Sequence, residues 1–124
     1  MPSTATLFVR FSQPGIHCWP DGPGYLATPH RHQFYVEVQL DSSVDDERSV
    51  EFHELLEHAK TVFRDVAHRE GSVLGAHNYG RMSCESMADA VGRRLAKYYN
   101  RTVSVSVSED DECGAIVVTD IDEL

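Results

Sequence analysis

Two histidines two residues apart open the segment PHRHQFYVEVQL at residues 29–40. In a β-strand, alternate side chains point to the same face, so His30 and His32 would lie side by side. His17, in the loop before this strand, could fold back toward them. Three imidazole nitrogens on a zinc ion leave its fourth position open for water or substrate, which is typical of a catalytic site. The alternative is that these are ordinary surface histidines, because the chain contains seven.

The segments on either side of this pair have the composition of β-strands. Residues 4–12 are rich in Val, Phe, Leu and Thr, and Pro14-Gly15 is expected to end this first strand. A loop rich in proline and glycine follows. The second strand is expected over residues 33–40, and it would carry the histidine pair at its start.

Two amphipathic helices are predicted in the middle of the chain. From Val50 to near Arg69, apolar residues recur every three or four positions, which is the helical period. Ser83 is the expected N-cap of a second helix, with Glu85 in its first turn and its end at Asn100. Its expected apolar stripe comprises Met87, Val91, Leu95 and Tyr98.

Two further strands are predicted near the C-terminus. Val103, Val105 and Val107 alternate strictly with serines, so the valines are expected to face the core. A fourth strand is expected over residues 115–119, after a turn at 110–114. The predicted element order is therefore ββααββ, with no internal repeat and no linker.

Length and composition exclude several classes of protein. At 124 residues the chain is expected to form a single domain, residues 1–124. A formal net charge of -9 disfavours nucleic acid and anionic lipid surfaces as partners. Its three cysteines are widely spaced, which suits a reducing cytoplasm better than a disulfide framework. The sequence shows no export signal and no segment apolar enough to span a membrane.

Over about residues 5–118, the chain resembles the 6-pyruvoyl-tetrahydropterin synthases and the bacterial 6-carboxytetrahydropterin synthases. The family's zinc-binding histidines fall on His17, His30 and His32, with Arg31 in place of a glycine between the last two. Its remaining motifs fall in the same order along this chain. They match Glu51-Phe52, Ala67-His68, Met82-Ser83-Cys84-Glu85, Glu109, Gly114 and Ile116.

The resemblance implies an α+β tunnelling fold. In this fold, a four-stranded antiparallel sheet carries two helices on one face, and sheets from several protomers join edge to edge into a barrel. A lone sheet would leave two edges and one face exposed, which association removes. By analogy, a homo-oligomer is expected, either a trimer or a hexamer.

The resemblance also implies roles for particular side chains. Glu109 would anchor a pterin or guanine ring through its N–H edge, since a carboxylate can accept two such bonds. By pattern alone it is an ordinary solvated acid in the run EDDE. Glu85 and Ser83 are secondary substrate-binding candidates, although Glu85 also suits a helix N-terminus. His68 is the expected catalytic histidine, and its alternative is an exposed residue at a helix end.

The sequence departs from the family at the catalytic positions. The family's cysteine lies just before the histidine pair, but residues 24–29 read GYLATP and contain no thiol. Ala67 replaces the aspartate that would orient His68. Cys18, beside His17, and Cys84, at a helix start where a thiolate is stabilised, could substitute, but buried cysteines usually only pack.

The sequence is compatible with three functions. The first is a zinc-dependent pterin lyase acting on a dihydroneopterin triphosphate type of substrate, in pterin or 7-deazaguanine biosynthesis. The second is a purine- or pterin-binding protein that keeps zinc and Glu109 but has lost the chemistry. The third and weakest is another reaction on a modified guanine. Each takes a small heterocycle and needs neither nucleic acid nor membrane.

Overall fold

The computed structural model describes residues 3–73 and 75–124, except for the side chains of residues 68–73. The strands of the described part are β1 (Thr4–His17), β2 (His30–Ser43), β3 (His68–Val73), β4 (Ala76–Gly80), β5 (Val103–Glu109) and β6 (Cys113–Thr119). The α-helices are α1 (Phe52–Asp65) and α2 (Cys84–Tyr99). Short 3-10 helices are η1 (Gly24–Ala27), η2 (Val44–Asp46) and η3 (Ile121–Glu123).

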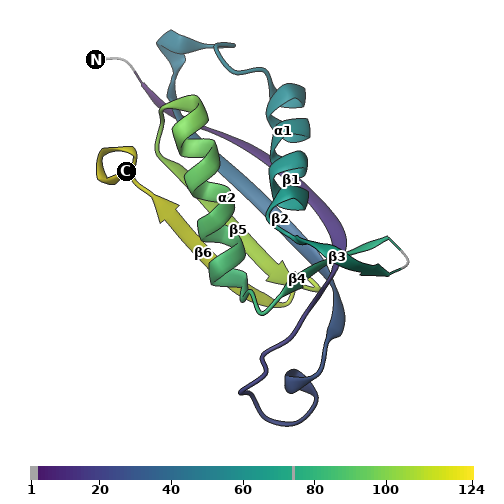
Figure 1. Ribbon diagram of the computed structural model, residues 1–124. Helices are drawn as coiled ribbons and strands as arrows, with labels where there is room; N and C mark the ends of the chain where they lie inside the picture. The colour runs from purple at the N-terminus through teal and green to yellow at the C-terminus, as the bar shows by residue number, and fades with distance from the viewer. Residues whose placement is uncertain (1–2, 74) are drawn as a thin grey trace.

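The strands form one sheet in the order β3-β4-β1-β2-β5-β6. Strands β1, β2, β5 and β6 each run antiparallel to their neighbours, and β4 joins the edge of β1 in parallel. Both α-helices cover the same face of the sheet (Figure 1). The predicted four-stranded antiparallel sheet with two helices on one face is therefore confirmed, with a short hairpin inserted between the helices.

The core lies between this sheet and the helices. All three valines of β5 are fully buried, as their alternation with serines predicted. On α2, Met87, Val91 and Leu95 are also fully buried, but Tyr98 is 71% exposed. Its inclusion in the apolar stripe was wrong, because the buried positions recur every four residues and the next of these is Tyr99, which packs against the core.

The helix ends follow from their capping residues. The side chain of Glu51 accepts a hydrogen bond from the His53 backbone at the start of α1. This helix ends at Asp65 rather than near Arg69, since the chain enters β3 at His68. At the start of α2, Ser83 Oγ accepts from the Ser86 N–H at 3.1 Å, which confirms the predicted N-cap. Neither helix is long and apolar enough to cross a membrane, and nor is any other helix in the described residues.

The hairpin β3–β4 was not predicted, and its anchor is Tyr79. The Tyr79 hydroxyl donates to the carbonyl of Phe63 at 2.9 Å and accepts from Gln13 Nε2 at 2.8 Å. Its ring is fully buried. Burial raises the pKa of Tyr79 above its usual value of 10.0. The hairpin is thereby fixed to both α1 and the edge of β1.

Strand β1 continues to His17 instead of ending before Pro14. Pro14 is tolerated because β1 pairs with β4 only from Gly15 onward, so no partner there requires the missing N–H. Gly15 leaves room for the ring of Phe34, which would lie 2.6 Å from a Cβ atom at that position. The extended strand brings His17 directly opposite His30.

Candidate metal centre

The three histidines singled out in the sequence converge at one end of the sheet. His17 is the last residue of β1, while His30 and His32 lie at the start of β2 on the face that the helices cover. Their ring centroids are 4.8 Å apart for His17 and His30, 5.3 Å for His17 and His32, and 5.0 Å for His30 and His32. The predicted trio is therefore assembled by the pairing of two strands.

Backbone carbonyls orient two of these rings. His17 Nδ1 lies 2.9 Å from the carbonyl oxygen of Met82, and His30 Nδ1 lies 2.9 Å from that of Thr28. A carbonyl can only accept a hydrogen bond, so the proton of each neutral ring must be on Nδ1. Each Nε2 atom then presents a lone pair, as a metal-binding histidine requires.

A carboxylate orients the third ring. His32 Nδ1 lies 2.8 Å from Asp110 Oδ2, and the other oxygen of Asp110 accepts the Gln33 N–H at 3.0 Å. The hydrogen bond from His32, followed by that from Gln33, holds the pKa of the Asp110 carboxyl below its usual value. Asp110 adopts a left-handed conformation with φ of 57° in the β5–β6 turn, which aspartate tolerates better than most residues.

Glu109 adds an oxygen to the three nitrogens. It is the last residue of β5 and pairs with Phe34 of β2, so it continues the core-facing alternation of the β5 valines. Its Oε2 atom lies 2.8 Å from His17 Nε2 and 3.4 Å from His32 Nε2. The possible ligand atoms of His17, His30, His32 and Glu109 all lie within 4.8 Å of one another.

This group fits a metal ion by its donor chemistry. His17 Nε2 is buried, and among the described residues it has no hydrogen-bond partner apart from its close approach to Glu109 Oε2. If the proton of the His17 ring is on Nδ1, a lone pair of Nε2 faces a lone pair of Glu109 Oε2, unless a cation or a proton lies between them. Three imidazole nitrogens and one carboxylate oxygen suit a borderline transition-metal ion better than magnesium or calcium, which prefer oxygen ligands. The four side chains could hold a metal ion.

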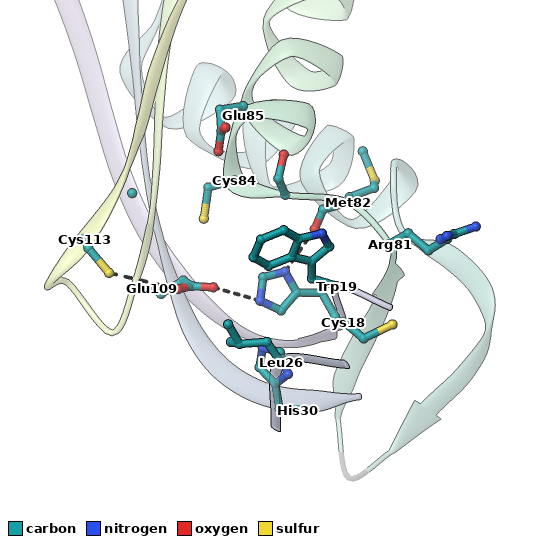
Figure 2. A pocket seen from close by; sticks show the side chains of 13 residues that line it. Cys18, Trp19, Leu26, His30, Arg81, Met82, Cys84, Glu85, Glu109 and Cys113 are labelled. Carbon is teal, nitrogen blue, oxygen red and sulfur yellow. Dashed lines mark hydrogen bonds and ion pairs between the residues drawn. The ribbon is translucent and has the colours of Figure 1, made fainter. Parts of the chain in front are cut away.

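A pocket of about 460 Å³ adjoins this group. Figure 2 shows Glu109 and Cys113 on one side of it, Cys84 and Glu85 at the start of α2, and Trp19 and Leu26 from the loop. This volume falls within the range of sites for small heterocycles. The pocket is bordered by the loop after β1, the start of α2 and the β5–β6 hairpin.

Among the predicted substrate-binding residues, Ser83, Glu85 and Glu109 all line this pocket. The hydroxyl of Ser83 is engaged as the N-cap of α2. His68 begins β3, but its side chain lies outside the described residues, so its catalytic role stays a prediction. Gly114 lines the pocket, whereas Ile116 is 72% exposed and takes no part in it.

Cys84, the pocket thiol at the start of α2, is not an activated nucleophile. Burial, followed by the charges of Glu109 and Glu85, raises the pKa of Cys84 to about 12. This is contrary to the expectation that the helix start stabilises a thiolate there. Cys18 and Cys113 also line the pocket, and Cys113 Sγ lies 4.0 Å from Glu109 Oε1.

The sequence did not identify Asp110 as a site residue or Trp19 as a residue that lines the pocket. Asp110 carries no signal as a histidine partner, because its contact with His32 depends on the register between β2 and β5. Trp19 lines the pocket and is 57% exposed. The position of Glu109 on the same face as the histidines could have been predicted, since it lies two residues after Val107 in a strictly alternating strand.

Comparisons with known proteins identify a fold. No protein-family model matches the sequence, and no curated protein matches it. The 6-pyruvoyl tetrahydropterin synthase of Plasmodium falciparum matches with a TM-score of 0.56 and 19% identity, covering 94% of this chain and 98% of that one.

Two variants of the Plasmodium vivax enzyme match as well, in which a catalytic glutamate is replaced by alanine or by cysteine. Each has a TM-score of 0.60 and covers 95% of this chain and 99% of its own, at identities of 16% and 15%. Likeness at this level of identity is a likeness of fold. The chain therefore has the tunnelling fold found in structures of 6-pyruvoyl tetrahydropterin synthases.

Proposed function

We propose that this protein is a zinc-dependent lyase of the 6-pyruvoyl- and 6-carboxytetrahydropterin synthase family. Its substrate would be of the dihydroneopterin triphosphate type, in pterin or 7-deazaguanine biosynthesis. The observation that carries the proposal is the convergence of His17, His30 and His32 beside a pocket of heterocycle size, in the fold of pterin-processing enzymes. The reaction would break a carbon–oxygen or carbon–carbon bond of the substrate's side chain.

The three histidines would hold the zinc ion through their Nε2 atoms, since each Nδ1 is already engaged. Zinc bound there would supply a Lewis acid that polarises the hydroxyl groups of a pterin side chain. Glu109 would accept hydrogen bonds from the N–H edge of the ring and fix its plane. Ser83 and Glu85 would contact the substrate from the start of α2, and His68 would move protons.

The same proposal includes assembly into a trimer or hexamer in the cytoplasm. Strands β3 and β6 are the edges of the sheet, and the face away from the helices exposes large apolar side chains. These are Phe8, Tyr35, Ile116 and Val118. Joining edges between protomers would pair the open strands and cover this face. Three unpaired cysteines suit a reducing compartment.

A second candidate function is a purine- or pterin-binding protein without turnover. Ala67 stands where the family has an aspartate, and residues 24–29 contain no thiol. The raised pKa of Cys84 also argues against this thiol as a replacement nucleophile. Against this alternative, a glutamate is a catalytic residue of the Plasmodium vivax enzyme, and Glu85 is a pocket carboxylate outside the histidine group that could serve in catalysis here.

Single-turnover assays separate the two candidates. Zinc-loaded or zinc-stripped protein, in excess over the substrate, would be mixed with dihydroneopterin triphosphate. The products would be separated by chromatography. A lyase forms a product with an altered side chain only when zinc is present. A binding protein retains the intact substrate in both forms, which would overturn the proposal of catalysis.

A further inference from the structure

The carboxylate of Glu109 is turned toward the histidines at one side of the pocket. Its Oε2 atom lies 2.8 Å from His17 Nε2 and 3.4 Å from His32 Nε2. Its other oxygen lies near Cys113 on the opposite side, and Figure 2 shows Glu109 joined by dashed lines in both directions. Oε2 therefore approaches two of the three imidazole nitrogens that would hold a metal ion.

The histidines cannot relieve this contact by changing tautomer without losing a hydrogen bond. His17 Nδ1 is fixed by the Met82 carbonyl, and His32 Nδ1 is fixed by Asp110. In the neutral rings, neither Nε2 atom has a proton to donate to Glu109. A positive charge among these atoms would turn the contact from repulsion into attraction. A tetrahedral zinc ion holds its ligand atoms about 3.3 Å apart, a value between the two distances from Glu109.

We infer that Glu109 is a displaceable fourth ligand of the metal centre. In the protein without substrate, its carboxylate completes a set of three histidines and one glutamate. When a heterocycle enters the pocket, the carboxylate leaves the ion and accepts hydrogen bonds from the ring. The second step rests on the proposed function, whereas the ligand role requires only that the histidines bind a metal ion.

The surroundings of Glu109 favour such a movement. Its backbone is fixed by pairing with Phe34 on one side and Cys113 on the other. Its side chain is 27% exposed, so rotation about its own bonds can carry the carboxylate between the histidines and the pocket. A metal ion with four protein ligands is closed, and a catalytic one needs an open position. Departure of Glu109 would open that position only when an occupant is present.

Asp110 cannot have the same role, although it is the next residue. Both of its oxygens are engaged, one by the His32 ring and the other by the Gln33 N–H. Glu112, in the same turn, is exposed and outside the histidine group. Glu112→Gln therefore provides a matched control that removes a nearby negative charge without touching the candidate ligands.

Cobalt(II) provides the test, because its visible spectrum reports its ligands and its coordination number. Zinc-stripped wild type, Glu109→Gln and Glu112→Gln would be loaded with Co²⁺, and the affinity would be measured by competition with a chelator. We expect Glu109→Gln to change the spectrum and to weaken binding by at least about 10-fold. Glu112→Gln should keep the wild-type spectrum and an affinity within about two-fold. Circular dichroism checks that each variant folds, and Glu109→Asp provides a second variant.

Neopterin, added to saturation as judged by calorimetry, tests displacement. The cobalt spectrum of the wild type should then shift, and that of Glu109→Gln should shift less. A wild-type spectrum unchanged by bound neopterin would overturn displacement. Identical spectra and affinities for wild type, Glu109→Gln and Glu109→Asp would overturn the ligand role. Failure of the proposed function looks different, because zinc-loaded protein would then form no product in the single-turnover assay, whereas the cobalt spectra report the ligands independently of turnover.

Discussion

His32 donates a hydrogen bond of 2.8 Å from Nδ1 to Oδ2 of Asp110, which lies 78 residues further along the chain. The contact links the start of β2 to the β5–β6 turn, next to Glu109. It fixes the tautomer of His32, so that Nε2 faces the other two histidines. One turn residue thus connects the geometry of the metal centre to the register of the sheet.

Asp110→Asn should weaken zinc binding by about 10-fold, at the low end for partners of metal-binding histidines. Asparagine tolerates the left-handed backbone and can still accept from His32, but it lacks the charge that strengthens this bond. Chelator competition measures the effect. Asp111→Asn is the matched control, because Asp111 is the next residue and is also left-handed, with φ of 60°. Equal losses in the two variants would point to the turn rather than to His32.

Glu109→Gln should also weaken the binding of neopterin to the zinc-loaded protein. The amide replaces one acceptor oxygen by a donor, which opposes the N–H groups of the ring. A loss of about 2 to 4 kcal/mol is expected, the scale of an unpaired buried hydrogen-bonding group. Titration calorimetry on Glu109→Gln and Glu112→Gln measures it, and an unchanged affinity in the first would remove Glu109 from the binding site.

Turnover on dihydroneopterin triphosphate should be slow, because the family's cysteine and aspartate are missing. Loss of a well-placed general base commonly costs a factor of about 100 to 10,000. Cys18→Ala and Cys84→Ala should leave the single-turnover rate within a few-fold, as the raised pKa of Cys84 keeps its thiol protonated. His68→Ala should reduce the rate strongly. The reverse pattern, an inactive cysteine variant and an active His68→Ala, would assign the chemistry to that thiol.

Burial of Tyr79 predicts a loss of stability at alkaline pH. Its pKa is raised in the folded protein, so the hydroxyl stays protonated there at pH values where the unfolded chain, with a pKa of about 10, loses the proton. The stabilisation is complete below pH 10 and declines above it. Urea unfolding at pH 8 and pH 11 should therefore show a smaller decline for Tyr79→Phe than for the wild type. Equal declines would contradict a native hydroxyl kept neutral by burial.

Much of the fold could be predicted because its signals are local. In β5, the alternation of valine and serine indicates which face is buried. In α2, the four-residue spacing of Met87, Val91 and Leu95 does the same. The hairpin β3–β4 lacks such a pattern. Tyr79 anchors it through Phe63 and Gln13, and these contacts exist only after the sheet and α1 have come together.

The histidines of the site were predictable because His30 and His32 share one strand, and strand geometry fixes their faces. The Nδ1 partners were not predictable in the same way. Asp110 and the Met82 carbonyl reach the rings from distant parts of the chain. Sequence motifs identify which residues can bind a metal, whereas the hydrogen bonds that orient them depend on tertiary register.

Metal analysis of the purified protein tests the central claim most directly. We expect about one tightly held zinc ion per chain, because three neutral imidazoles converge on one point. His30→Ala and His32→Ala should each lose most of this zinc while remaining folded by circular dichroism. His53→Ala should keep it, since the His53 side chain is 89% exposed and outside the group. Full retention of zinc in both His30→Ala and His32→Ala would contradict the account.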